Sequence, residues 1–399
     1  MEAAKTSVLI INGGSSSIKF SFYKIKDLTK QLLHGELENT GAKNAKLHFS
    51  NIITNKKNSI DVKSNSQNDA VSFLIDWFEK QDEFVSIKAI GHRIVHGMKH
   101  TQPEKITPEL LNELKEISAY DPEHLPEEIK LIEIFQKRFP AIEQVACFDT
   151  SFHTSMPTVA KLLPIPRKYF SMGIQRYGFH GLSYSYLMEE LHKLSGNKID
   201  KEKIILAHLG NGASLAAIKD GKSIDTSMGF TPTSGIPMST RTGDLDPGVA
   251  WYLMQEEKLS AKQFNHLINH ESGLLGISET NSDMRKLIKL QATDNRAAEA
   301  IELFCYQTKK WIGAFAAALG GLDTLVFSGG IGENAPEIRQ RICNGLQFLG
   351  IELDEKRNAN NEAIISADHC KVIVRVIKTN EELMIAKLTC DVLDYSVKH

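Results

Sequence analysis

Arginine and histidine recur in three short segments that are bracketed by small residues. Arg93 lies in the run 91–97, and His180 and Arg241 lie in similar runs rich in glycine or threonine. A guanidinium group is a planar fork that binds carboxylate or phosphoryl oxygens through paired hydrogen bonds. Taken singly, each segment is better explained by a structural ion pair. Taken together, the three indicate a site for a small anion.

Carboxylates stand at three further positions where they can do chemistry. Asp149 follows an apolar run that ends at Phe148, and two short polar clusters occupy 283–285 and 379–382. Open α/β sheets bind their ligands at the carboxyl ends of strands, so Asp149 is a candidate catalytic group. A helix N-cap explains Asp149 almost as well, and both clusters also fit capping segments.

A glycine turn between two apolar strands occurs twice at a constant spacing. Gly13 corresponds to Gly210 and Ser17 to Ser214, an offset of 210 − 13 = 197 in a chain of 399 residues. Such turns form a cradle of backbone N–H groups that suits a polyphosphate. A third turn at 329–334 leads into a predicted helix, whose N-terminus attracts anions. One such turn alone is more often a plain hairpin, but three favour a nucleotide clamped between two related lobes.

The predicted elements place these residues at the ends of strands. Strands are expected for 7–23 (two), 144–148, from 204 onward with a hairpin turn at 220–221, and 324–327; helices are expected for 71–80, 108–117, 126–139, 297–319, from near 336, and for 382–393. The polar stretch 38–68 is expected to hold one more strand within loose loops.

Composition excludes several classes of protein. A hydrophobic content of 42% and a net charge of −2 are those of an ordinary globular chain and argue against nucleic-acid or membrane partners held by bulk charge. The five cysteines are widely spaced, and His92 and His96 lack a metalloprotease context, so disulfides and a zinc site are both disfavoured. The start lacks a signal-peptide pattern, and a cytoplasmic protein is expected.

Together these segments resemble the acetate kinase family, which includes acetate and propionate kinases and belongs to the superfamily of sugar kinases, heat-shock ATPases and actin. The resemblance covers nearly the whole chain. It implies an α/β fold of two duplicated actin-like (ribonuclease H-like) domains with an active-site cleft between them. The expected domains are 1–150, completed by a C-terminal helix in 381–399, and a nucleotide-binding domain at 151–380. A homodimer is implied by the resemblance alone.

The resemblance also assigns roles to single residues. Those implied in catalysis are Asp149, Arg93, His180, Arg241 and His124. The acyl substrate is implied to contact Arg93, Val95, Phe179 and Pro232, and Mg²⁺ (with Mn²⁺ as an alternative) is implied to bind Asn12 and Glu381. The residues implied to contact ATP or ADP are Lys19, Ser15, Ser17, His208, Leu209, Gly210, Asn211, Gly212, Asp283, Met284, Arg285, Gly330, Ile331, Gly332, Glu333 and Asn334.

One segment departs from the family pattern. Family members commonly carry Pro-Leu-His-Asn-Pro, whereas this chain has Glu123 and Leu125 on either side of the retained His124. A buried unpaired carboxylate is costly, so Glu123 is expected to point outward or to pair with a cation. The departure leaves the choice between acetate and propionate open.

The predicted function is a reversible, Mg²⁺-dependent phosphoryl transfer from ATP to acetate. Because acetate is already ionised at neutral pH, no general base is required, and Asp149 is expected to hold Mg²⁺ or to orient an arginine. The alternatives are a propionate or other short-chain acyl kinase and, more remotely, an actin- or chaperone-like ATP-binding module with no small acceptor.

Overall fold

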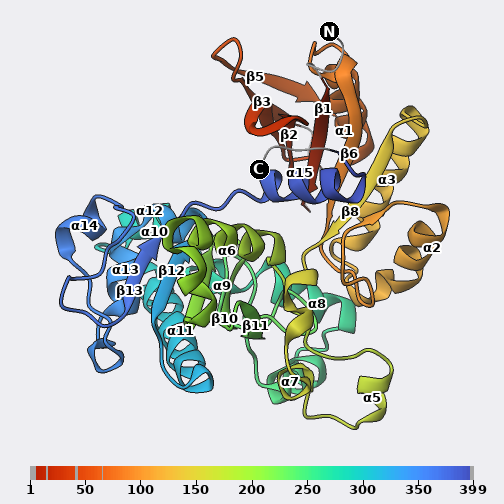
Figure 1. Cartoon of the computed structure of the whole chain (residues 1–399). Coiled ribbons are helices and arrows are strands. Elements are labelled where there is room, and N and C mark those ends of the chain that lie inside the picture. The colour runs from red at the N-terminus through yellow and green to blue at the C-terminus, as the bar shows by residue number, and fades with distance from the viewer. Residues whose placement is uncertain (1–5, 15–16, 41–43, 65, 396–399) are drawn as a thin grey trace. The chain divides into compact units, whose positions relative to one another are not determined.

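The computed structural model describes residues 6–14, 17–40, 44–64 and 66–395 (Figure 1). The chain divides into two compact units. The first unit comprises Met1–Ser151 and Asn380–His399, and the second comprises Phe152–Thr379. Among the described residues, no helix has both the length and the apolar character needed to cross a membrane.

The first unit is built on a mixed sheet in which the N-terminal strand is central. Its strands are β1 (Ser7–Gly13), β2 (Ser17–Lys24), β3 (Asp27–Glu38), β4 (Asn44–Asn51), β5 (Lys56–Lys63), β6 (Ile87–Ile94), β7 (Glu104–Lys105) and β8 (Glu143–Phe148), in the order β5-β4-β3-β2-β1-β6-β8-β7. The strands β1, β6 and β8 are parallel, whereas β1 to β5 form an antiparallel meander. The parallel strands therefore end at one edge of the sheet.

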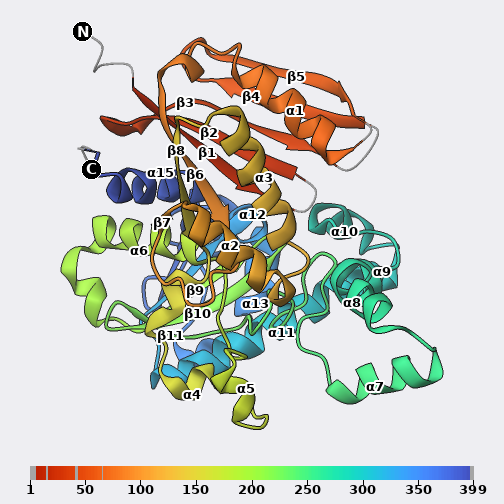
Figure 2. The same ribbon diagram turned by 90° about the vertical axis from the view of Figure 1, so that its right-hand side faces the viewer.

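Helices cover both faces of this sheet (Figure 2). They are α1 (Gln67–Phe78), α2 (Pro108–Glu116), α3 (Leu125–Arg138) and α15 (Glu381–Val392). Leu74 of α1 and Phe135 of α3 share one apolar cluster with Leu9 and Phe20 of the sheet. On the opposite face α15 packs so closely that a Cβ at Gly91 would lie 2.2 Å from the hydroxyl of Thr389.

The expectation for 38–68 is wrong. Instead of one strand in loose loops, β3 ends at Glu38 and both β4 and β5 follow it in a regular antiparallel register. Many side chains of this stretch are polar because its outer surface is exposed, which hid the alternation. The inner positions Leu47 and Val62 are buried, and Phe49 packs against Trp77 of α1 with ring centroids 4.7 Å apart.

The second unit is built on a smaller mixed sheet. Its strands are β9 (Ile204–Leu209), β10 (Ala213–Lys219), β11 (Lys222–Thr226), β12 (Thr324–Ser328) and β13 (Ile373–Val376), in the order β11-β10-β9-β12-β13. The helices of the unit are α4 (Thr158–Lys161), α5 (Lys168–Ser171), α6 (Gly181–Ser195), α7 (Pro247–Glu256), α8 (Ala261–His270), α9 (Gly273–Ser278), α10 (Met284–Leu290), α11 (Asn295–Leu319), α12 (Gly329–Asn334), α13 (Pro336–Cys343) and α14 (Glu355–Ala359). Leu187 and Leu191 of α6 pack on Leu206 and Val326 of the sheet.

The two sheets repeat one arrangement. In each sheet, a central strand (β1 or β9) pairs antiparallel with the next strand along the chain, and that strand pairs antiparallel with a third. The central strand also pairs parallel with a later strand (β6 or β12), which is parallel to one further strand. The repeat maps β1 onto β9 and β2 onto β10, as the offset of 197 predicts. The predicted α/β fold of duplicated actin-like domains is therefore confirmed. The hairpin turn at Asp220 and Gly221 is confirmed as well, and both residues have positive φ.

Candidate functional site

The first unit gathers predicted site residues at the carboxyl ends of its parallel strands. Asn12 lies near the end of β1, Arg93 lies near the end of β6, and Asp149 follows the last residue of β8. The N-terminus of α15 brings Glu381 to the same place, because the amide of Asn12 donates to its carboxylate over 3.2 Å. Segments far apart in the sequence thus converge as open α/β sheets predict.

Arg93 and Asp149 form a tight ion pair at this edge. The Nε and Nη2 atoms of Arg93 donate to Oδ2 of Asp149 over 2.9 and 2.5 Å. The carboxylate is only 1% exposed, while the guanidinium keeps 16% of its surface. Burial by itself lowers the pKa of Arg93, but the carboxylates of Asp149, Glu381 and Glu128 outweigh it and raise that pKa. The guanidinium is therefore permanently charged and fixed in orientation.

Asn12 and Glu381 fit a magnesium ion in chemical type. A carboxylate and an amide carbonyl are hard oxygen donors, and Mg²⁺ is usually held by one or two protein oxygens together with water and phosphate. The neighbouring Asn380 caps α15 by accepting the N–H of Leu383 over 2.9 Å, so the capping alternative for this cluster is also realised. Lys19 is exposed on β2 directly opposite Asn12.

The remaining predicted residues of the first unit lie around the first glycine turn and α3. His124 precedes α3, and its Nδ1 lies 2.9 Å from Oδ1 of Asp121. Ser17 is half-buried at the start of β2, and Ser15 lies outside the described residues. Val95 is buried one residue beyond β6.

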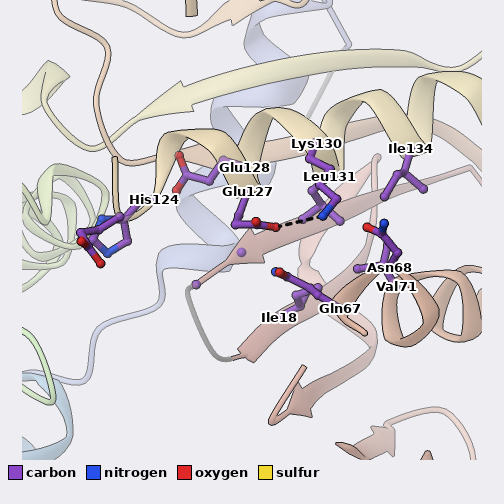
Figure 3. A pocket seen from close by; sticks show the side chains of 13 residues that line it. Ile18, Gln67, Asn68, Val71, His124, Glu127, Glu128, Lys130, Leu131 and Ile134 are labelled. Atoms are coloured by element: carbon purple, nitrogen blue, oxygen red, sulfur yellow. Dashed lines mark ion pairs between the residues drawn. The ribbon is translucent and has the colours of Figure 1, made fainter. Parts of the chain in front are cut away.

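A small pocket lies beside His124 (Figure 3). It is lined by side chains of α1 and α3, among them Val71 and Leu131, and by Gly13 and Gly14, where β1 ends and the first glycine turn begins. Glu123 is half-buried in its wall, as part of the segment that departs from the family pattern. Leu125 is fully buried in the core of α2 and α3.

In the second unit, His180 is held in place by a buried hydroxyl and a second histidine. Its Nδ1 lies 2.8 Å from Oγ of Ser214, which in turn lies 2.5 Å from the phenol oxygen of Tyr184. The ring of His180 stacks on that of His208 with centroids 4.3 Å apart. His180 has a φ of 60°, an uncommon backbone conformation for a residue other than glycine. Strain of this kind is tolerated where surrounding contacts fix the side chain.

The second glycine turn brings Arg241 to the same place. A Cβ at Gly212 would lie 3.1 Å from Nε2 of His180 and 3.8 Å from Nη1 of Arg241. Arg241 also donates from Nη1 to the carbonyl of Pro232 over 3.2 Å. Two cationic or hydrogen-bonding side chains therefore lie against the bare backbone of Gly212, where an added Cβ would require His180 to shift slightly.

The third glycine segment differs from its prediction, because it is itself the helix α12 and the turn is confined to its start. Gly329 has a φ of 76°, and a Cβ there would lie 2.7 Å from the carbonyl oxygen of Leu209. Gly330 lies near the second glycine turn, since a Cβ at Gly210 would be 3.9 Å from its nitrogen. Glu333 accepts the N–H groups of Gly329 and Thr379 over 2.9 and 3.1 Å. This carboxylate thus holds together the start of α12 and the segment after β13.

The cluster 283–285 forms the start of α10. Asp283 caps the helix by accepting the N–H of Arg285 over 2.9 Å, and its other oxygen accepts from the guanidinium of Arg285 over 2.7 Å. Met284 is buried, whereas the Arg285 side chain is 87% exposed. The capping alternative is realised here too. Phe179 and Pro232, the other apolar positions, are buried within the second unit.

Comparison with known protein families identifies the family of the chain that carries these residues. A model of the acetokinase family matches residues 7–387. The chain belongs to the acetokinase family. Family members are kinases that use ATP and transfer its phosphoryl group to a carboxylate, and the chain is accordingly a phosphotransferase.

Similar proteins agree over nearly the full length of this acetokinase-family chain. An acetate kinase of Thermoanaerobacterium thermosaccharolyticum is 42% identical over 394 residues, covering 96% of this chain and 98% of its own. Among solved structures, a propionate kinase from Francisella tularensis superposes with a TM-score of 0.90 at 38% identity, covering 97% of this chain and 99% of its own. An acetate kinase of Porphyromonas gingivalis does so with a TM-score of 0.86 at 38% identity, covering 97% and 100%.

Three residues that hold predicted site residues in place were not predicted from the sequence of this family member. Ser214 and Tyr184 fix His180, and Glu128 of α3 contacts the segment after Arg93. Ser214 carried a signal, because it is the repeat partner of Ser17. Tyr184 and Glu128 carried none, since each stands at an ordinary helical position.

Proposed function

We propose that this acetokinase-family chain transfers the γ-phosphoryl group of ATP reversibly to acetate, giving acetyl phosphate and ADP. The observation that carries the proposal is the buried pair of Arg93 and Asp149 at the strand ends of a chain matched by the acetokinase model over nearly its full length. The names of the similar acetate kinases support acetate as the acceptor.

Arg93 binds the carboxylate and helps it approach the nucleotide. In the forward reaction an acetate oxygen attacks the γ-phosphorus while the bond to the bridging oxygen of ADP breaks, so two anions must approach one another. Positioning and charge neutralisation supply most of the rate in such transfers. The pairing with Asp149 supports this role, because the guanidinium is already oriented before the substrate arrives. Asp149 acts here as the group that orients Arg93.

His180 and Arg241 act on the transferring phosphoryl group. Both approach the bare backbone of Gly212, which supports a shared oxyanion ligand at that place. The second glycine turn and the start of α12 take the nucleotide, with Gly330 and Asn211 among the contacts. His124 supports the reacting groups from the side of α3. By analogy with catalytic arginines elsewhere, loss of either arginine reduces turnover by roughly 10³-fold.

Mg²⁺, or Mn²⁺ in its place, is the expected metal. The oxygens of Asn12 and Glu381 would hold it, and the bound ion would supply neutralisation of phosphate charge. Lys19, opposite Asn12 on β2, contacts ATP. The remaining nucleotide contacts are Ser15, Ser17 and the residues of 208–212, 283–285 and 330–334.

Apolar contacts set the acyl preference. Val95, Phe179 and Pro232 are the apolar residues that would contact the acyl group, and each is buried within its own unit. One methylene changes discrimination by only about 1–3 kcal/mol, so activity on propionate is expected beside that on acetate. The similar propionate kinase supports testing both. We further propose a homodimer that works in the cytoplasm, where the reduced state of the five cysteines is maintained.

A hydroxamate assay with acetate, propionate and butyrate tests the proposal. We expect ATP-dependent acyl phosphate formation with the highest kcat/KM on acetate. A higher kcat/KM on propionate would reassign the acceptor and leave the reaction type intact. ATP hydrolysis that is indifferent to every carboxylate would refute the proposal and favour an actin- or chaperone-like module.

A further inference from the structure

A buried acid of α3 contacts the backbone beside Arg93. Glu128 lies in the first turn of α3 and is only 5% exposed. Both of its carboxyl oxygens accept the N–H of Val95, over 3.3 and 3.0 Å. Val95 is two residues from Arg93 and is one of the residues proposed to contact the acyl group. Glu128 therefore fixes the backbone that carries both substrate contacts of the first unit.

The pKa of Glu128 depends on its burial and on the charged groups around it. Arg93 faces it from β6, Asp149 faces it from the end of β8, and Asp121 faces it from the segment before α3. His124 and Glu127 lie beside it on its own element and line the same pocket. The pKa of Glu128 is raised to about 8: burial raises it most, Asp121 and Asp149 also raise it, and Arg93 and the Val95 N–H lower it.

Glu128 borders the pocket of the first unit. The same pocket is lined by His124 and Leu131 (Figure 3). A proton released by the carboxyl group can pass to water there, so Glu128 can equilibrate with the solution during turnover.

We propose that Glu128 is a positioning residue that sets the affinity of Arg93 for the carboxylate substrate through its own ionisation. The inference rests on the proposed function. In the protonated state Glu128 keeps its contact with Val95, and the positive charge of Arg93 faces the carboxylates of Asp149 and Glu381. On release of the proton to water, a further carboxylate faces the guanidinium and competes with the incoming anion.

The KM for acetate is therefore expected to rise with pH. Below about pH 8 most Glu128 is neutral, and the KM for acetate is low. Above that pH the ionised form dominates, and KM rises. A unit charge near the bound anion at an effective dielectric constant near 20 weakens binding by roughly tenfold or more. The effect falls on KM more than on kcat, because Arg93 retains its orientation.

The test compares Glu128→Gln with the wild type across this pH range. The variant keeps the shape of the side chain and an acceptor for Val95 but cannot ionise. We expect a KM for acetate close to that of the wild type near neutral pH and a flat profile at alkaline pH, where the wild-type KM rises. Glu127→Gln is the matched control, because Glu127 is the adjacent residue of the same pocket and pairs with Lys130 at 3.6 Å. The KM of this control variant should depend on pH as that of the wild type does.

A second readout does not depend on activity. Because the folded-state pKa of Glu128 lies above its unfolded value of about 4.3, the stability that it contributes is present in acid and is lost as pH rises to about 8. The urea midpoint of the wild type should therefore fall over this range relative to that of Glu128→Gln.

The outcomes are distinguishable. Identical KM profiles of wild type and Glu128→Gln, with acetate turned over normally, would overturn this inference alone. If no carboxylate is turned over, the proposed function fails, while the urea midpoints still show whether Glu128 titrates near pH 8. Should Glu128→Gln fail to fold, a wild-type KM that stays flat from neutral to alkaline pH would reject the inference.

Discussion

Replacing Asp149 by asparagine probes the pair on which the proposed chemistry depends. Asp149→Asn keeps the volume of the side chain and one oxygen but removes the negative charge that faces Arg93. The two bonds to Oδ2, at 2.9 and 2.5 Å, lose the negative charge of their acceptor, although the guanidinium that donates them stays charged. Bonds to charged groups contribute about 1.5–3 kcal/mol, against about 1 kcal/mol for neutral ones.

These values give the expected size of the effect. The difference of about 0.5–2 kcal/mol for each of two bonds sets a range of about 1–4 kcal/mol of lost orientation, or roughly 5- to 10³-fold in kcat if Arg93 must be oriented in the transition state. Stability should fall as well, because breaking a buried ion pair by changing one partner costs about 3–5 kcal/mol. The carboxylate is 1% exposed, so water does not replace the lost partner.

The assay measures hydroxamate formation with acetate and, on the same protein, urea unfolding. Asp368→Asn is the matched control, because Asp368 pairs with Arg357 through two bonds of 2.7 and 3.0 Å but is 84% exposed. It should leave both turnover and stability unchanged. An Asp149→Asn protein with normal kcat and an unchanged unfolding free energy would refute the reasoning.

Further predictions concern the second unit and the thiols. Gly212→Ala should lower kcat by roughly tenfold or more, because its Cβ would lie 3.1 Å from Nε2 of His180 and displace it; unchanged kinetics would contradict the shared position of His180 and Arg241. Gly313→Ala, inside α11 with nothing within 4 Å of the added Cβ, should instead raise the free energy of unfolding by about 1 kcal/mol in urea melts at unchanged kcat. With Ellman's reagent, one thiol should react rapidly in the native protein and five after denaturation, because burial raises the pKa of four cysteines to about 12 and leaves only Cys370 partly exposed. A second rapid thiol would contradict the described packing.

Local patterns predicted β9 to β12, α11 and the start of α13 in the second unit and β1, β2 and β8 in the first, but not β13 or the helices α4 to α10 and α14. The helix that ends at Gly320 has the predicted C-cap, with a φ of 71° at the glycine, and the strand before Asp149 ends as predicted. Both element ends depend on residues that are adjacent in the sequence, so a local sequence pattern is sufficient to predict them. The stretch 38–68 was misjudged because its strands are half-exposed, and the core that stabilises them is supplied by Trp77 and Phe78 of α1.

By itself, the sequence determined the repeat, the glycine turns and the residue types of an anion-handling kinase, because offset, backbone freedom and side-chain chemistry are properties of the chain. The tertiary structure alone decided which of these groups act on one another. It paired Arg93 with Asp149, 56 positions apart, and placed Glu128 against Val95 and Ser214 against His180. Such contacts arise where parallel strands end at one edge of a sheet and helices cross it, and burial there fixes charge and proton affinity in a way that no spacing along the chain records.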